Sequence, residues 1–247
     1  MTGDERAVCL ITGGASGIGA ACVTSFAAAG YRVAFGDVQE GKGRAIAVGL
    51  GEAAFFSRLD VRSEADFAEA VAATLSRWGR LDCLVNNAAI GGVIGPVAEI
   101  PVDEYDHTCA VVQRSVFLGV REAARAMLPR RTGSIVNIAS ISGLTGGYGP
   151  HVYSACKAAV IALTKSLSKE LVGKGDICVN SVSPAVIQTP ILDQLSREQI
   201  DMMLSKIPLG RTGKPDEVAA LVHFLSSADC SFTTGFCFDI SGGRATY

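Results

Sequence analysis

Tyr153 and Lys157 are the two residues whose types and spacing most suggest chemistry. A helix places residues four positions apart on one face, so a lysine ammonium would lie beside a phenol. A nearby positive charge favours the phenolate, and a tyrosine whose pKa falls from ~10 towards neutrality can exchange protons with an alcohol or a ketone. Alone, the pair also fits a solvated helix edge, so neighbouring motifs must decide.

A glycine-rich segment near the N-terminus predicts a site for a phosphate-bearing ligand. The apolar run 7–11 leads into Thr12-Gly-Gly-Ala-Ser-Gly-Ile-Gly19. This order is typical of a strand, a tight turn and a helix, in which glycine lets the backbone approach a pyrophosphate and the helix N-terminus offers free N–H groups. We expect a dinucleotide to contact Gly13, Ser16, Gly17, Ile18 and Gly19.

Asp37 indicates which dinucleotide binds. It follows a second apolar run, 32–36, where a parallel strand would deliver its carboxylate to the adenosine ribose. A carboxylate accepts hydrogen bonds from both ribose hydroxyls and repels a 2′-phosphate. Because neither Arg nor Lys occupies positions 14–16 or 38, the sequence favours NAD over NADP.

The motifs, in their order along the chain, resemble those of the short-chain dehydrogenase/reductase family over essentially the whole sequence. Besides 12–19, they are Asp60-Val61, Asn86-Asn87-Ala88, Ser140 with Tyr153 and Lys157, Asn180 to Pro184, Thr189-Pro190 and the tail 235–243. The resemblance implies further cofactor contacts at Asp60, Val61, Asn87, Ala88, Tyr153, Lys157, Pro184 and Thr189.

The resemblance also implies hydride transfer between nicotinamide C4 and a carbinol or carbonyl carbon. Tyr153 would be the general base in oxidation and the general acid in reduction. Lys157 would lower the pKa of Tyr153 and hold the nicotinamide ribose, and Ser140 would hydrogen-bond the substrate oxygen.

Three positions depart from the family pattern. Ala89 and Ala185 stand where glycine is usual, and both are mild changes if their φ is negative. Val112 stands at the position of a helical asparagine thought to link the active-site lysine through water to bulk solvent. Valine cannot hold that water, so we expect another proton exit, through backbone carbonyls or Ser115.

The elements that must position these residues follow the βαβ pattern, in which short apolar runs alternate with longer helical ones. We expect a Rossmann-like, doubly wound α/β fold with about seven parallel strands and helices on both faces. The expected strands are 7–12, 32–37, 53–59, 81–86, 134–139, 177–183 and 235–239. The expected helices are 17–29, 63–78, 103–128, 152–172 and 215–226, with Ser63 and Asp103 as N-caps and Pro129 and Gly173 as stops.

Composition predicts one domain over residues 1–247, and the resemblance implies a segment at about 186–210 that covers the substrate. The 22 basic and 24 acidic residues are not gathered into patches, which argues against nucleic acid and membrane partners. Eight dispersed cysteines indicate reduced thiols, and the absence of a signal peptide or a long apolar run indicates a cytoplasmic protein. His107, His151 and His223 lack metal-ligand spacing, so no metal is expected.

The candidate substrate wall is mainly apolar, and Ile94, Tyr148, His151 and Val186 are its candidate contacts. Leu192, Leu195, Met202 and Met203 are spaced as in an amphipathic lid helix. These features favour oxidation of a secondary alcohol, cyclic or terpenoid-like, to its ketone. The alternatives are a carbonyl reductase, a sugar or polyol dehydrogenase, and a non-catalytic NAD-binding protein of the same fold.

The resemblance further implies a homo-oligomer, a tetramer or a dimer, built through the helices 103–128 and 152–172. Small residues on the second helix permit close helix approach, but they equally fit packing on the protein's own sheet: Ala155, Ala158, Ala159 and Ala162.

Overall fold

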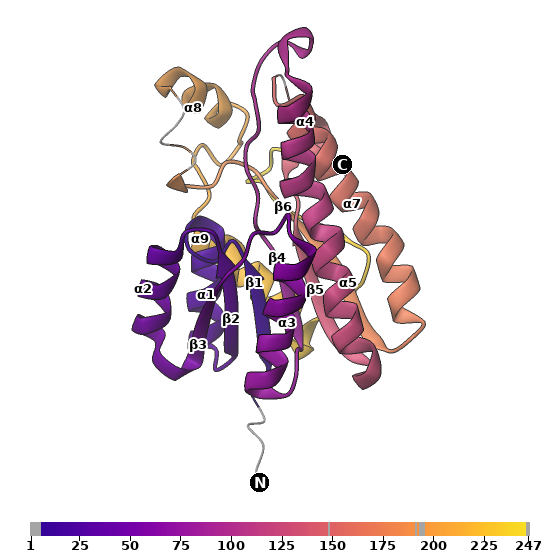
Figure 1. The fold of residues 1–247 in the computed structure, drawn as a ribbon. Helices are drawn as coiled ribbons and strands as arrows, with labels where there is room; N and C mark the ends of the chain where they lie inside the picture. The colour runs from indigo at the N-terminus through magenta and orange to yellow at the C-terminus, as the bar shows by residue number, and fades with distance from the viewer. Residues whose placement is uncertain (1–5, 148, 191, 193–195, 246–247) are drawn as a thin grey trace.

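Seven parallel strands form one sheet in the computed structural model, which describes residues 6–147, 149–190, 192 and 196–245. The strand order is β3-β2-β1-β4-β5-β6-β7 (Figure 1). The strands are β1 Val8–Thr12, β2 Arg32–Asp37, β3 Ala54–Arg58, β4 Cys83–Asn86, β5 Thr132–Ile138, β6 Asp176–Pro184 and β7 Cys237–Ile240. The expected doubly wound α/β fold is therefore confirmed.

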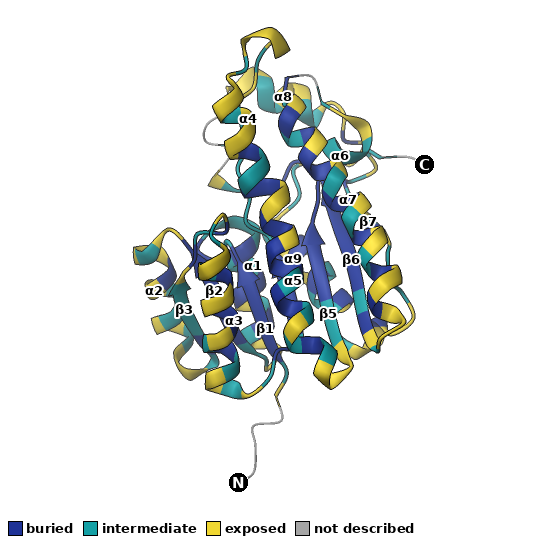
Figure 2. Cartoon of the chain, turned by 45° about the vertical axis from the view of Figure 1, so that its right-hand side comes forward, coloured by how far each residue is buried: buried dark blue, intermediate teal, exposed yellow. Residues whose placement is uncertain are grey.

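Helices cover both faces of this sheet, and their buried sides meet the dark strands in Figure 2. One face packs against α3, α5 and α7, and the other packs against α1, α2 and α9. The helices are α1 Gly17–Ala28, α2 Glu40–Leu50, α3 Glu64–Trp78, α4 Val102–Cys109, α5 Ser115–Met127, α6 Ile141–Thr145, α7 His151–Val172, α8 Arg197–Leu204 and α9 Pro215–Ser226.

The central strands read as continuous apolar runs because both of their faces are covered. In β1, Leu10 belongs to the core cluster under α3, α5 and α7, whereas Cys9 and Ile11 belong to the cluster under α1 and α9. Successive side chains of a strand point to opposite faces, so every position of β1 is buried.

Helix α2 was not predicted from the sequence. Its segment contains Gly41, Gly43 and Gly49, and glycine weakens a helix by about 1 kcal/mol relative to alanine. Packing supplies the reason for one of them, because a Cβ at Gly43 would collide with the ring of Phe56 on β3. The glycine therefore lets α2 approach the sheet closely.

The expected helix 103–128 is wrong as a single regular element. The helix begins at Val102 after Pro101, so Asp103 lies in the first turn rather than at the N-cap. A π-helical turn, 110–114, then separates α4 from α5. Ser115 N–H donates to the carbonyl of Ala110, five residues back, and this adds one residue to the turn.

Other predicted boundaries follow the local signals. Ser63 caps α3, as expected, and its hydroxyl accepts a hydrogen bond from the N–H of Asp66. Gly173 ends α7 as expected. Among the described residues, no helix is long and apolar enough to cross a membrane.

Candidate active site

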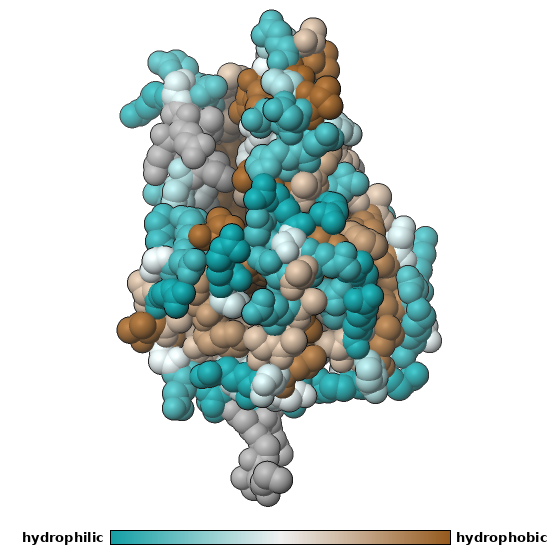
Figure 3. Space-filling view, in the orientation of Figure 1, coloured by the Kyte–Doolittle hydropathy of each residue, from teal (hydrophilic) through white to brown (hydrophobic). Residues whose placement is uncertain are grey.

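The predicted site residues gather at the carboxyl edge of the sheet. β1 and β4 are neighbours at its centre, and the chain leaves them in opposite directions, so the strand order reverses there. Ligands of open α/β sheets bind at such a crevice. Above this edge α4 and α8 project in Figure 1, and Figure 3 shows a hollow between the two projections.

Ser140, Tyr153 and Lys157 come together at the ends of β5 and α7. Ser140 caps α6, and its Oγ accepts a hydrogen bond from Ser142 N–H over 3.2 Å. The same hydroxyl is hydrogen-bonded to Tyr153. The Nζ of Lys157 lies 5.7 Å from the centre of the Tyr153 ring. The spacing on α7 therefore places the lysine near the tyrosine ring.

The electrostatics differ from the expected lowering of the Tyr153 pKa by Lys157. Desolvation raises the pKa of Tyr153, and the hydrogen bond with Ser140 opposes this rise. Lys157 is itself buried, and this burial lowers its pKa to about 8. Its Nζ donates to the carbonyl of Ile138 over 2.6 Å instead of to the phenol. Ser140 is therefore the group of the protein that lowers the tyrosine pKa.

Gly143 holds this arrangement together, although the sequence did not single it out. A Cβ at Gly143 would lie 2.7 Å from the carbonyl carbon of Lys157 and 2.8 Å from the nitrogen of Ala158. Real Cβ atoms do not approach a backbone so closely, so only glycine lets α6 rest on this turn of α7. The sequence signal that could have identified this close contact is a glycine three residues after Ser140.

The glycine turn is closed by Asn87, which follows β4. Its side-chain amide donates to the carbonyls of Thr12 and Gly13 over 3.0 and 3.1 Å. The hydroxyl of Thr12 accepts from the N–H groups of Asn87 and Ala88. A Cβ at Gly13 would lie 2.8 Å from the Cα of Ala88, and φ at Gly13 is +67°, so glycine is required.

The start of α1 fits an anionic ligand. Its first turn carries no acidic residue, and the side chain of its N-cap, Ser16, makes no capping hydrogen bond. N–H groups at such a helix start bind phosphates well. Thr189 lies over the same point, since a Cβ at Gly17 would be 3.1 Å from its methyl group. Ile18 packs against the core below.

Asp37 lies at the end of β2, where the sequence predicts the adenosine ribose. Its two oxygens accept hydrogen bonds from the N–H groups of Ala15 and Gln39, over 3.1 and 2.9 Å. A carboxylate has about four acceptor positions, so two remain for ribose hydroxyls. The geometry of the described residues therefore fits a dinucleotide.

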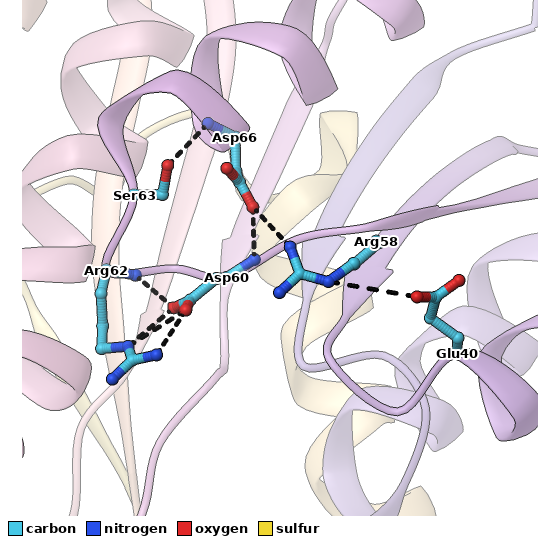
Figure 4. A network of polar contacts seen from close by, with 6 residues as sticks. All are labelled: Glu40, Arg58, Asp60, Arg62, Ser63 and Asp66. Atoms are coloured by element: carbon cyan, nitrogen blue, oxygen red, sulfur yellow. Dashed lines mark hydrogen bonds and ion pairs between the residues drawn. The ribbon is translucent and has the colours of Figure 1, made fainter.

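Asp60 is held by a neighbour that the sequence analysis missed. The guanidinium of Arg62 contacts both of its carboxylate oxygens, the shortest distance being 2.6 Å (Figure 4). These hydrogen bonds lower the pKa of Asp60 to about 2. The charge of an aspartate predicted to contact adenine is thereby balanced within the protein, while the adjacent Val61 is buried in the core.

Arg58 lies beside Asp37, because the two residues are paired in the register of β2 and β3. Its guanidinium contacts Asp66 at 3.3 Å and Glu40 at 4.0 Å (Figure 4). Arg58, the cation paired with Asp37 in the strand register, is thus already in contact with two other carboxylates.

The candidate substrate contacts divide into two groups. A Cβ at Gly149 would lie 2.8 Å from Ile94, so these segments adjoin, and the exposed His151 follows as the first residue of α7. Val186 instead lines a separate cavity of about 120 Å³ with Ile207 and residues 240–242. None of the three catalytic candidates lines that cavity. Tyr148 lies outside the described residues.

The predicted lid is only partly described. Leu195 lies outside the described residues, whereas Met202 and Met203 lie on α8. Ser196 and Gln199 form a capping box at its start, and no residue of α8 is buried. Pro184 is the buried last residue of β6, at the same edge of the sheet as the glycine turn.

Val112 lies in the π-helical turn and is fully buried in the core. The hydroxyl of Ser115 donates to the carbonyl of Val111 over 2.5 Å. Ser115 therefore satisfies a carbonyl that the longer turn takes out of the α-helical pattern, and its proton is engaged there. No group of histidine, cysteine and carboxylate side chains in the described ranges could hold a metal ion.

Comparison with known proteins agrees with this geometry. A family model described as enoyl-(acyl carrier protein) reductase matches residues 13–245. The chain is 42% identical to 2-dehydro-3-deoxy-L-rhamnonate dehydrogenase (NAD(+)) of Sphingomonas sp. strain SKA58, covering 96% of this chain and 95% of that protein. It is 39% identical to a 3-alpha-(or 20-beta)-hydroxysteroid dehydrogenase of Mycobacterium tuberculosis strain CDC 1551 / Oshkosh, covering 96% and 88%.

Solved structures agree as well. An actinorhodin polyketide ketoreductase variant with NADPH superposes with a TM-score of 0.93 at 33% identity over all of both chains. A 3-ketoacyl-(acyl-carrier-protein) reductase from Brucella melitensis with NADH gives 0.93 at 32% identity, covering 98% of this chain and 99% of that one. The family model spans residues 13–245 and these relatives are similar over nearly the whole chain, so the chain belongs to the short-chain dehydrogenase/reductase family of oxidoreductases.

Proposed function

We propose that this enzyme oxidises a secondary alcohol to its ketone with NAD. The observation that carries the proposal is the Ser140–Tyr153 hydrogen bond beside a buried Lys157, at the edge where Asn87 closes the glycine turn. When bound, a nicotinamide cofactor supplies the hydride acceptor.

In this proposal the chemistry is divided among three protein groups. Ser140 binds the substrate oxygen and stabilises the phenolate form of Tyr153, which accepts the hydroxyl proton of the alcohol. Lys157 places a positive charge near the ring and is anchored by the carbonyl of Ile138. The reverse reaction, carbonyl reduction, uses the same groups with the proton moving the other way.

The preference for NAD rests on charge. A 2′-phosphate would meet the carboxylate of Asp37, and Arg58, the adjacent cation, is paired with Glu40 and Asp66. Because Arg58 is already paired, it compensates this repulsion poorly, and the repulsion disfavours NADP. The rhamnonate dehydrogenase relative carries NAD in its name, which supports this choice.

An apolar, cyclic or terpenoid-like alcohol is the proposed substrate. Val93 and Ile94 are 36% and 51% exposed on the segment that adjoins Gly149, so this wall offers apolar surface. The hydroxysteroid dehydrogenase relative, whose name denotes an alcohol on a polycyclic apolar skeleton, supports the class. A sugar-acid alcohol is the second candidate, because the rhamnonate dehydrogenase relative is 42% identical.

One experiment separates these readings. The purified protein is incubated with NAD or NADP and with cyclic, terpenoid, polyol and sugar-acid alcohols, and reduced cofactor is followed by absorbance. Turnover of cyclic alcohols with NAD supports the proposal. Turnover of sugar acids alone supports the second candidate, and turnover only with NADP contradicts the cofactor assignment. NAD binding without turnover in either direction would support a non-catalytic protein.

A homo-oligomer is also proposed, on the resemblance. Ala155, Ala158 and Ala162 are exposed along α7 rather than packed on the protein's own sheet, and Phe117 on α5 is 48% exposed. These surfaces suit the close approach of a second copy. Sedimentation of a monomer at micromolar concentration would contradict the proposal.

A further inference from the structure

Two cysteines from different helices meet beside the catalytic candidates. The sulfurs of Cys109 and Cys156 are 3.6 Å apart, although the residues are 47 positions apart in the chain. Cys109 is the last residue of α4, directly before the π-helical turn. Cys156 lies on α7, immediately before Lys157 and one helical turn after Tyr153. We infer that this pair is a reversible redox site, in which peroxide oxidises the two thiols to a disulfide.

The two thiols differ in access. Cys109 is partly exposed, whereas Cys156 is 1% exposed. Burial and the neighbouring Cys109 raise the pKa of Cys156 to about 12, so Cys156 is a protonated thiol at neutral pH. Cys109 is therefore the sulfur that meets a soluble oxidant, and Cys156 is the resolving sulfur.

The chemistry is balanced with hydrogen peroxide as the oxidant. The Cys109 sulfur attacks one peroxide oxygen, the O–O bond breaks, and water leaves with the thiol proton, which gives a sulfenic acid. The Cys156 sulfur then attacks the Cys109 sulfur, the S–O bond breaks, and a second water leaves. Two thiols and one peroxide thus yield one disulfide and two waters.

A second thiol pair provides an internal comparison. Cys9 and Cys83 are register partners on β1 and β4, so their side chains share one face of the sheet. Both are buried, at 0% and 1% exposure. The thiols are neighbours in both pairs, but only the first pair has a thiol that solvent can reach. Peroxide should therefore link Cys109 to Cys156 and leave Cys9 and Cys83 reduced.

The disulfide would act on the active site through α7. A disulfide bond is ~2.05 Å long, so the sulfurs must approach each other from 3.6 Å. The approach draws the last turn of α4 towards the turn of α7 that carries Tyr153 and Lys157. A displacement of ~1 Å at a catalytic group can cost 10²-fold in rate. We expect turnover of the oxidised protein to fall at least ~10-fold and to recover with dithiothreitol.

The test is peptide mass spectrometry of the full chain with and without peroxide treatment, in which the thiols that are still free after the treatment are alkylated before digestion. A cross-linked peptide pair containing Cys109 and Cys156, lost on reduction, supports the inference and does not rest on the proposed function. Its absence, with Cys109 still alkylated or oxidised alone, overturns it. Cross-links formed equally at Cys9 and Cys83 would overturn the argument from access.

Matched variants separate the disulfide from general oxidation. Cys109→Ser should keep its turnover through peroxide treatment. Cys156→Ala removes the other sulfur of the disulfide and should likewise prevent its formation. Cys178→Ser, which removes a half-buried thiol on β6, should lose turnover as the wild type does. If Cys109→Ser is inactivated as strongly as the wild type, or if the cross-linked protein keeps full turnover, the disulfide does not control the site.

Discussion

Lys157 and Ile138 are joined by a 2.6 Å hydrogen bond from the buried ammonium to the last carbonyl of β5. This bond ties α7 to the carboxyl end of the strand that leads to Ser140. The tyrosine, the lysine and the serine therefore share one rigid frame, in which the position of the lysine is set by the backbone rather than by the phenol.

Tyr153→Phe should keep the packing of the ring while removing the group that exchanges the proton. Turnover should fall by at least ~10²-fold, the lower range for general acid–base catalysis. NADH binding, followed by fluorescence, should be nearly unchanged. Near-normal turnover of the variant would remove Tyr153 from the catalytic role.

Asp37→Ala should weaken NAD binding, since it removes a charged acceptor whose hydrogen bonds are worth about 1.5 to 3 kcal/mol. It also relieves repulsion of the 2′-phosphate, so the ratio of kcat/KM for NADP to that for NAD should rise. Glu40→Gln is the comparison variant, because it removes the more distant of the two carboxylates that contact Arg58 and leaves Asp37 in place. A wild type that already prefers NADP would contradict the role of Asp37.

The buried Lys157 predicts a pH dependence of stability. Its folded pKa of about 8 is below the ordinary value of 10.5, so between these values the unfolded chain holds a proton that the folded chain has released. The free energy of unfolding therefore rises with pH across this window. Below pH 8 the folded chain bears the full cost of burying the charged lysine.

Compared with Lys157→Met, the wild type should gain roughly 2 to 4 kcal/mol of unfolding free energy between pH 7.5 and 10.5, measured by urea titration. Lys169→Met, on the exposed face of the same helix, is the control and should track the wild type. Parallel curves for wild type and Lys157→Met would show that the ammonium does not bear this penalty.

Gly143→Ala should separate α6 from α7 at the catalytic turn. Its Cβ would press on the backbone of Lys157 and Ala158, so Ser140 at the start of α6 must move. We expect kcat to fall more than NADH affinity. Gly146→Ala is the control, because it adds the same methyl group at a position where φ is +71° and nothing lies within 4 Å of the new Cβ. Its effect therefore reports backbone strain alone. Equal effects of the two variants would argue against the contact.

Val112→Asn tests whether the lack of the usual family asparagine slows turnover. Val112 is fully buried among apolar side chains, so an asparagine without partners should destabilise the fold by about 1 to 3 kcal/mol. If proton release limits the wild type, the variant should turn over faster and the solvent isotope effect should fall. A wild-type solvent isotope effect near unity, with no gain in the variant, would make Val112 a packing residue only.

Much of the fold and the placement of the site could be predicted because they depend on short-range patterns. Apolar runs of strand length predicted all seven strands to within a few residues, since strands covered on both faces leave no polar alternation. The end of each run then placed Gly13, Asp37, Asn87 and Ser140 at one edge of the sheet, because parallel strands share their direction. The pairing of Tyr153 with Lys157 followed from helical period alone.

What the sequence left undecided depends on contacts between distant segments. The glycines of α2 argued against a helix until Phe56 was placed against Gly43, and the π-helical turn at Val112 has no local signal that competes with an ordinary helix. The pKa of Lys157 depends on its burial, which tertiary packing produces. The meeting of Cys109 with Cys156 requires α4 to pack on α7. Sequence period determines which face a residue takes, whereas tertiary packing decides what it meets there.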